Sequence, residues 1–229
     1  MNRYGTVYGG WNLPQDIQLS SDSIVYSAGV GEDISFDILL QEKFDLNIVL
    51  IDPTQRAFWH FEEVKDYFST MNPDFSGDIQ RDYLKIIGNS RPNFSKFTYI
   101  QKGLWSHADS LKFYKPINEK YVSHTLIENM YSNNYELVEV DSIKNIMNAL
   151  NHTHIDILKV DIEGSELIVL GQMLKDGIFP NYICIEFDLK LKGIDRENKT
   201  DSLISDLEKA GYILADNDRW NCLFVLKGR

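Results

Sequence analysis

The stretch that most constrains the fold is residues 23–36, where an apolar run breaks into Gly-x-Gly and restarts with helical periodicity. This order predicts a strand, a tight turn and a helix capped by Asp33. Gly29 and Gly31 have no Cβ, so backbone N–H groups at the start of the helix can approach a ligand closely. Ile34 replaces the third glycine of the dinucleotide fingerprint, which disfavours a nicotinamide or flavin cofactor. By itself, the pattern also fits an ordinary strand-to-helix turn.

Two further apolar strands are expected to end in acidic residues at the same edge of the sheet. Residues 47–51 lead to Asp52, and residues 155–160 lead to Asp161 and then to a helix. An acid at the tip of the second strand of a β-α-β unit is placed to accept hydrogen bonds from ribose hydroxyls. Because ligands of parallel sheets bind beyond the carboxyl ends of the strands, these acids and the glycine turn predict one site.

Strands and helices alternate along most of the 229 residues, which predicts one α/β domain over residues 23–229. We expect a mostly parallel, twisted sheet of about seven strands with helices on both faces. The predicted strands are residues 23–28, 47–51, 97–102, 155–160, 181–187, 212–215 and 222–226. The last two are expected to form a C-terminal antiparallel hairpin.

Three segments depart from this alternation. Residues 72–96 carry scattered Pro and Gly around a short helix predicted at 79–87, and residues 109–140 are predicted to hold two short strands. We interpret both as insertions. Residues 1–22 predict a weakly structured, aromatic arm, which either covers one edge of the core or lies over the ligand site.

Charge and composition exclude several function classes. The formal net charge of −11, without a basic cluster, argues against nucleic acid as a partner, because such binding relies on Lys and Arg. Cys184 and Cys222 lie in apolar runs, which favours buried hydrophobic positions over a zinc site or a disulfide. No signal-peptide core or transmembrane run of roughly 20 apolar residues is present, so we expect a cytoplasmic protein. The oligomeric state stays open, and a homodimer is compatible with the sequence.

Several motifs, in one order along most of the chain, resemble those of the FkbM-type S-adenosylmethionine-dependent methyltransferases. They are residues 8–11, 25–37, 51–54, 103–105, 122–124, 159–166 and 185–187. The resemblance implies a Rossmann-like class I methyltransferase with S-adenosylmethionine as its cofactor. It also implies a saccharide hydroxyl as the acceptor, in a nucleotide sugar, a surface polysaccharide or a glycolipid precursor. The chain departs from the pattern at Asp188, where related sequences tend to have histidine.

The resemblance assigns roles to residues around the cofactor. It implies that the glycine turn lies near the methionine part, with Glu32 or Asp33 near the amino group, and that Trp105 or its neighbours line the adenine pocket. Trp105 fits equally well as a residue that packs beneath a loop. The predicted cofactor-binding residues are Tyr8, Trp11, Ser27, Gly29, Gly31, Glu32, Asp33, Asp52, Pro53, Thr54, Gly103, Leu104, Trp105 and Asp161.

Methyl transfer to a hydroxyl requires an aligned acceptor oxygen and a group that removes its proton. The predicted catalytic residues are Asp161, Glu186 and Asp188 at strand tips and His124 in the second insertion. Histidine has a suitable pKa for a general base, whereas the three acids could instead hold Mg²⁺, which would lower the pKa of the hydroxyl. Alternatively, Glu186 pairs with Lys159 and His124 is a loop residue.

Two other functions remain open from the sequence. An N-methyltransferase acting on an amine or amino sugar needs no strong base, because a neutral amine is already nucleophilic. A catalytically idle domain of the same fold could bind a nucleotide-like ligand or a protein, although the acidic strand tips argue against it.

Overall fold

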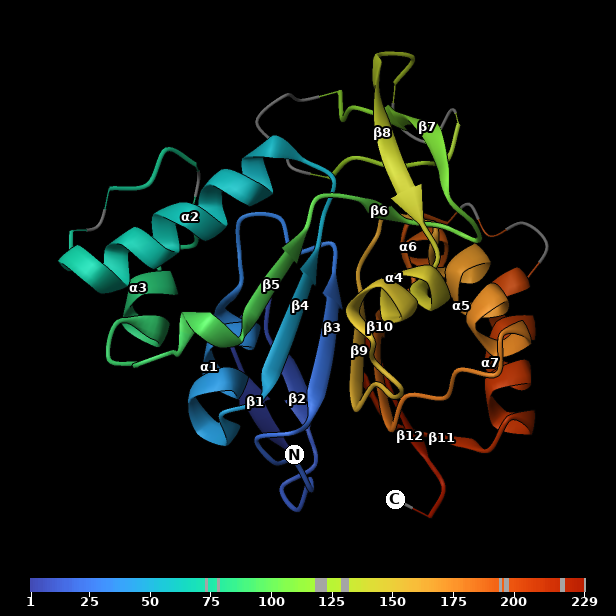
Figure 1. Ribbon diagram of the computed structural model, residues 1–229. Coiled ribbons are helices and arrows are strands. Elements are labelled where there is room, and N and C mark those ends of the chain that lie inside the picture. Colours follow the sequence, from blue (N-terminus) through green and yellow to red (C-terminus); the bar gives the residue numbers. More distant parts are fainter. Residues whose placement is uncertain are drawn as a thin grey trace.

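The computed structural model describes residues 1–72, 74–77, 79–117, 123–128, 132–193, 195, 198–218 and 221–228, without the side chains of residues 190 and 191. The main sheet contains β3 (Ile24–Ala28), β4 (Asn47–Ile51), β5 (Phe97–Ile100), β9 (Ile157–Val160), β10 (Tyr182–Glu186), β11 (Tyr212–Asp218) and β12 (Asn221–Leu226). Its seven strands lie in the order β11-β12-β10-β9-β3-β4-β5 (Figure 1). The five strands from β10 to β5 are parallel, and β12 runs antiparallel to both β10 and β11. The predicted α/β fold with a mostly parallel sheet is confirmed.

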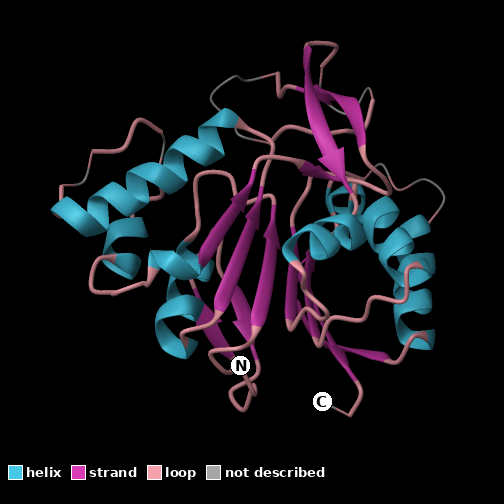
Figure 2. Ribbon diagram, in the orientation of Figure 1, coloured by secondary structure: helices cyan, strands magenta, loops and turns pink. Residues whose placement is uncertain are grey.

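Helices cover both faces of this sheet (Figure 2). They are α1 (Ser35–Phe44), α2 (Gln55–Thr70), α3 (Tyr83–Ile87), α4 (Ile143–Leu150), α5 (Glu166–Lys175), α6 (Asp188–Leu191) and α7 (Lys199–Lys209), with a 3-10 turn at Phe94–Lys96. One apolar cluster lies between the sheet and α4, α5 and α7, and a second lies between the sheet and α1, α2 and α3. Within the described residues, no helix has both the length and the apolar content needed to cross a membrane.

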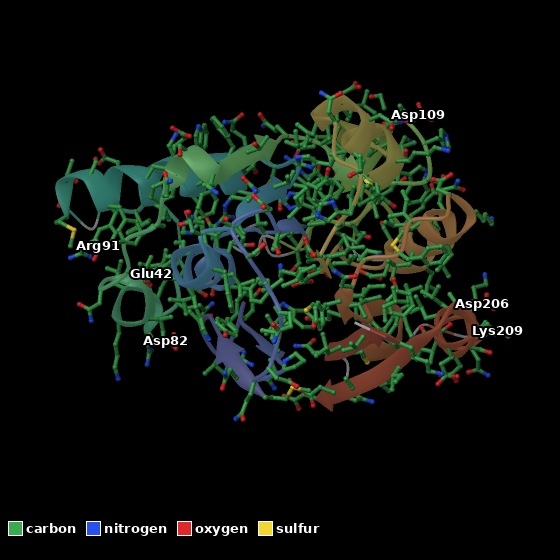
Figure 3. The ribbon with its side chains drawn as sticks, turned by 60° about the horizontal axis from the view of Figure 1, so that its bottom comes forward. Glu42, Asp82, Arg91, Asp109, Asp206 and Lys209 are labelled. Atoms are coloured by element: carbon green, nitrogen blue, oxygen red, sulfur yellow. The ribbon has the colours of Figure 1, made fainter. Side chains whose placement is uncertain are left out.

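Alternation along the central strands builds these two clusters. Tyr26 and Val49 belong to the cluster on the α5 side, whereas their neighbours Val25 and Ile48 belong to the cluster on the α1 side. Strands buried on both faces read as continuous apolar runs, which is why the sequence reveals them. Many charged side chains lie on the outside, such as those of Glu42 and Arg91 on one flank and Asp206 on the other (Figure 3).

The N-terminal arm is more ordered than the sequence predicts. Strands β1 (Asn2–Tyr4) and β2 (Trp11–Leu13) pair antiparallel, and the side chains of Tyr4, Trp11 and Leu13 are buried in the α1-side cluster. The prediction of a weakly structured segment is therefore wrong for this part of the arm. Strands of three residues are too short to show a period-2 pattern, so only the packing reveals them.

The second insertion forms a small sheet beyond the carboxyl ends of the main strands, at the opposite end from both termini (Figure 1). Strand β6 (Gly103–Leu104) pairs with β8 (Tyr135–Asp141), which pairs with β7 (Asp109–Tyr114). The two strands predicted within residues 109–140 are thus present. Val122, part of one family-like motif, lies outside the described residues. In the first insertion, helix α3 is shorter than the predicted helix at 79–87.

Candidate active site

A cavity of about 570 Å³ lies at the carboxyl ends of β3, β4, β9 and β10. Four parts of the chain surround it: the N-terminal arm, the glycine turn, the strand ends and the inserted sheet. The predicted site residues that line it are Tyr8, Gly29, Gly31, Glu32, Asp33, Asp52, Pro53, Thr54, Gly103, Leu104, His124, Asp161, Glu186 and Asp188. The fold therefore brings most of the predicted residues to one place.

Three predicted cofactor residues do not line the cavity. Trp11 is buried in the core beside α1, and Ser27 is fully buried within β3, next to Asp37 of α1. Trp105 packs on the apolar cluster of the inserted sheet, which includes Phe113. All three side chains pack within the protein, and their contact with a cofactor stays a prediction. A strand interior points its side chains at the sheet faces rather than at the strand ends, which explains the position of Ser27.

The glycine turn is held tightly against the neighbouring strand end. Gly29 has a φ of +71°, and a Cβ built on it would lie 1.6 Å from the carbonyl oxygen of Asp161. Its N–H donates to the carbonyl of Ile51 at 3.0 Å. The backbone approach that requires glycine at position 29 is therefore to the protein itself, which differs from the sequence-based expectation of an approach to the ligand.

Asp52 is already oriented by the protein. Its Oδ1 accepts hydrogen bonds from the N–H and the hydroxyl of Thr54, at 2.9 and 2.6 Å, and its Oδ2 accepts one from the N–H of Gly31 at 3.1 Å. The carboxylate is 6% exposed. Because each carboxylate oxygen can accept more than one hydrogen bond, Asp52 retains capacity toward the hydroxyls of a ligand.

Glu32 and Asp33, the two predicted partners of a ligand amino group, both have protein partners. The guanidinium of Arg56 donates to both oxygens of Glu32, at 3.2 and 2.7 Å. Asp33 accepts from the hydroxyl of Thr6 at 2.5 Å and from the N–H of Ser35 at 3.0 Å. The N-cap residue of α1 is Ile34 rather than Asp33, because the helix begins one residue later than the pattern indicates.

Acidic residues gather where β9 and β10 end. The pairing of Val160 with Ile185 brings the next two residues, Asp161 and Glu186, side by side. Seven described carboxylates but only two described lysines line the cavity wall, together with His124. The acids are Glu32, Asp33, Asp52, Asp161, Glu163, Glu186 and Asp188, and the lysines are Lys159 and Lys192. The wall therefore favours cationic or neutral ligands over anions.

Crowding among these acids shifts their proton affinities. Burial, reinforced by neighbouring carboxylates, raises the pKa of Glu186 to about 8 and that of Asp188 to about 7. Desolvation also raises the pKa of Asp161, against the opposing field of Lys159. Tyr8 lies beside the same cluster, and partial desolvation together with these charges raises the pKa of its phenol. Carboxylates that titrate near neutral pH suit general-base catalysis, while the Tyr8 phenol stays protonated.

Two lysines restrain parts of this cluster. Lys192 bonds to Glu163 and to Asp188, whose Oδ1 lies 2.7 Å from the Lys192 Nζ. Lys159 donates to the carbonyl of Gly29 at 3.1 Å. The side chains of Lys159 and Glu186 are both described, and no ion pair joins them, so the alternative in which they pair is not supported.

His124 reaches the cavity from the inserted segment, as expected, and its ring stacks on Phe113 with 5.3 Å between centroids. The next residue, Thr125, is fully buried and donates to the carbonyl of Glu163 at 2.5 Å. This bond attaches the insertion to the loop that follows β9. His124 and the acidic cluster therefore face one cavity.

Glu166, which was not among the predicted site residues, supports the loop after β9. Its buried carboxylate accepts from the N–H groups of Ile162 and Gly164, at 3.2 and 2.9 Å. Between them, Glu163 adopts a left-handed φ of +55°. The only sequence signal for this role was the position of Glu166 within the family-like motif at 159–166.

The described part of the chain contains no group of three His, Cys, Asp or Glu side chains arranged to hold a metal ion. Asp161, Glu186 and Asp188, the predicted ligands of such an ion, line one cavity without forming such a group. The structure therefore offers no support for the metal version of the predicted mechanism.

Comparison with known families gives an independent result. A family model described as Methyltransferase FkbM domain matches residues 15–214. The match includes the glycine turn, the end of β4, His124 and the acidic ends of β9 and β10. No curated protein matches the chain.

Proposed function

Because this chain belongs to the FkbM methyltransferase family, we propose that it transfers a methyl group from S-adenosylmethionine to a hydroxyl of a saccharide, on a Rossmann-like class I fold. The observation that carries this proposal is the single cavity that joins Asp52 and the glycine turn to the acidic ends of β9 and β10. We call these two parts the cofactor half and the acceptor half. A cofactor in the first half can present its reactive carbon to an acceptor in the second.

The cofactor half suits a ribose-bearing ligand. Asp52 holds a fixed orientation through Thr54 and Gly31 and would accept hydrogen bonds from ribose hydroxyls. Gly103 and Leu104 form an apolar wall beyond it, which suits an adenine ring. When bound, S-adenosylmethionine supplies the methyl group on a positively charged sulfur, and the acidic wall favours that charge.

In the acceptor half, we assign Glu186 as the group that removes the hydroxyl proton. Its side chain is partly exposed to the cavity, and its pKa of about 8 lies near the operating range of a general base. Asp188 is less suited, because it is buried and its Oδ1 bonds to Lys192. Asp161 and His124 are the other candidates for the general base within the same cavity. The loss of turnover on substituting each residue distinguishes them from Glu186.

The acidic wall also narrows the acceptor. A phosphate group close to the reacting hydroxyl would face several carboxylates and only two lysines. A neutral saccharide, as in a surface polysaccharide or a glycolipid precursor, avoids this repulsion. We therefore rank a nucleotide sugar below these acceptors unless its phosphates lie outside the cavity.

One observation favours a second candidate function, N-methylation of an amine or amino sugar. The same carboxylates would attract an ammonium group, and Glu186, with a pKa of about 8, could accept a proton from it to leave a nucleophilic neutral amine. Paired hydroxy and amino sugars of identical ring configuration distinguish the two functions by the position of the new methyl group.

The test is calorimetry followed by turnover. S-Adenosylhomocysteine and S-adenosylmethionine should bind the wild-type protein, and NAD should not. A screen of neutral, amino and phosphorylated saccharides should then release S-adenosylhomocysteine, with and without EDTA. Binding of NAD alone would contradict the proposal, and binding without turnover on any acceptor would favour the idle nucleotide-binding domain. Turnover abolished by EDTA would restore the metal version of the mechanism.

A further inference from the structure

The turn between β1 and β2 forms part of the cavity wall, and hydrogen bonds of Thr6 hold the turn in this position. Thr6 is fully buried, and its hydroxyl donates to Asp33 at 2.5 Å while accepting from the N–H of Gly9 at 2.9 Å. Its own N–H donates to the hydroxyl of Ser35 at 2.9 Å, and its carbonyl accepts from the N–H of Gly10 at 3.1 Å. One threonine thus bonds both to its own turn and to the start of α1.

The turn packs directly on Asp33. A Cβ built on Gly9 would lie 2.6 Å from the Cγ of Asp33, so the turn approaches that carboxylate as closely as glycine allows. The other oxygen of Asp33 accepts from the N–H of Ser35 at 3.0 Å. Asp33 therefore connects the turn to the beginning of α1, which is a different role from the predicted contact with a ligand amino group.

Tyr8, at the tip of this turn, lines the cavity but is held by little packing of its own. Tyr8 is 64% exposed, and it lies beside the acidic cluster that includes Asp161 and Glu186. A side chain so exposed keeps its position only if its backbone is held in place. The hydrogen bonds of Thr6, two residues earlier, and of Gly9, the next residue, provide that restraint.

We propose that Thr6 is a positioning residue of the active site, which acts through Asp33 and Gly9 to hold Tyr8 as a wall over the bound cofactor. The inference rests on the proposed function for the identity of the ligand, S-adenosylmethionine. It adds that cofactor affinity depends on a buried hydroxyl that does not itself line the cavity. Loss of this hydroxyl does not change Tyr8 itself, but it removes the hydrogen bond that attaches the turn carrying Tyr8 to Asp33.

The experiment measures the dissociation constant of S-adenosylhomocysteine by calorimetry for four variants of the full chain. Thr6→Val removes the hydroxyl at nearly constant volume and should weaken binding about tenfold. Thr6→Ser keeps the hydroxyl and should bind within about twofold of wild type. Tyr8→Ala should weaken binding about as much as Thr6→Val, and the double variant should bind no more weakly than Tyr8→Ala alone.

The double variant separates positioning from a general loss of stability. Two independent effects would add, whereas a hydroxyl that acts through Tyr8 loses its effect once Tyr8 is removed. Leu207→Ala, on the buried face of α7, serves as a control that lowers the thermal midpoint and leaves the dissociation constant unchanged.

The outcomes are distinct. If the wild-type protein does not bind S-adenosylhomocysteine, the proposed function fails before the inference is reached. If it binds, and Thr6→Val binds equally well or the two substitutions add, the positioning role of Thr6 is refuted. If Thr6→Val does not fold, Tyr8→Ala decides alone, because unchanged affinity in that exposed variant overturns the role of the turn.

Discussion

The two halves of the cavity differ in how the protein prepares them. In the cofactor half, hydrogen bonds to the backbone and to Thr54 fix Asp52, and Arg56 neutralises Glu32. In the acceptor half, carboxylates crowd together, and the pKa of Glu186 rises to about 8. In the first half the acids have close hydrogen-bond or ion-pair partners, whereas in the second two lysines only partly offset the charge of several crowded carboxylates.

This difference assigns separate tasks to the two halves. Side chains that hydrogen bonds already hold in place lose little freedom when a ligand binds, so the first half favours affinity. A half with perturbed pKa values is suited to moving a proton, so it favours turnover. Substitutions in the cofactor half should therefore change binding constants, and substitutions in the acceptor half should change rates.

The largest expected effect is on turnover. Glu186→Gln keeps the shape of the side chain but cannot accept a proton, and general-base catalysis typically contributes roughly 10²–10⁴-fold. We expect kcat to fall by about that factor once an acceptor is known, while cofactor affinity stays within about twofold. Glu208→Gln, exposed on α7, is the matched control. A large loss in His124→Ala with little change in Glu186→Gln would transfer the base role to His124.

The next effect is on folding stability. Gly29→Ala places a methyl group against the carbonyl of Asp161 at a residue with a φ of +71°, so it combines overpacking with backbone strain. The free energy of unfolding should fall by roughly 2–4 kcal/mol in denaturant titrations. Gly171→Ala, where an added Cβ has no neighbour within 4 Å, should not destabilise the protein. Equal stability of both variants would disprove the close contact between the glycine turn and β9.

A smaller effect is expected on cofactor affinity. Asp52→Ala removes charge-assisted hydrogen bonds to the ribose, which are typically worth roughly 1.5–3 kcal/mol each. Calorimetry should show S-adenosylmethionine binding weakened about tenfold or more. Asp206→Ala, on the outer surface of α7, should bind as wild type does (Figure 3). Since Asp52 also orients Gly31 and Thr54, a thermal melt should establish that the variant is folded.

A further effect is expected on the pH dependence of stability. Folding raises the pKa of Glu186 from its ordinary 4.5 to about 8, so the folded state holds this proton more tightly than the unfolded state. This contribution is fully present below about pH 4.5 and is lost as the pH rises through about 8. Glu186→Gln should therefore raise the thermal midpoint relative to wild type at about pH 9 and have little effect near pH 5. The same difference at both pH values would mean that Glu186 is not perturbed.

Much of the cavity was predictable because its residues follow strands that the sequence displays clearly. The buried runs that end at Asp52 and Asp161 are continuous and apolar, and parallel strands bring their carboxyl ends to one edge. The same rule placed Glu186 beside Asp161. These predictions needed only local pattern and one topological rule.

The remaining features depend on contacts between distant residues. The bond between Thr6 and Asp33 joins residues 27 positions apart in the sequence, and that between Lys192 and Glu163 joins residues 29 positions apart. No local sequence pattern predicts either bond. Aromatic residues such as Trp11 and Trp105 suit a core as well as a ligand site, and only packing decides between the two. Sequence patterns therefore do not reveal the long-range polar contacts, nor do they decide between the two placements of an aromatic residue.

The most direct test of the division between the halves is the affinity of S-adenosylhomocysteine for two variants measured side by side. We expect Asp52→Ala to lose about tenfold or more in affinity, while Glu186→Gln binds like wild type and fails only in turnover. Equal weakening in both variants, or loss of binding in Glu186→Gln alone, would contradict separate cofactor and acceptor halves.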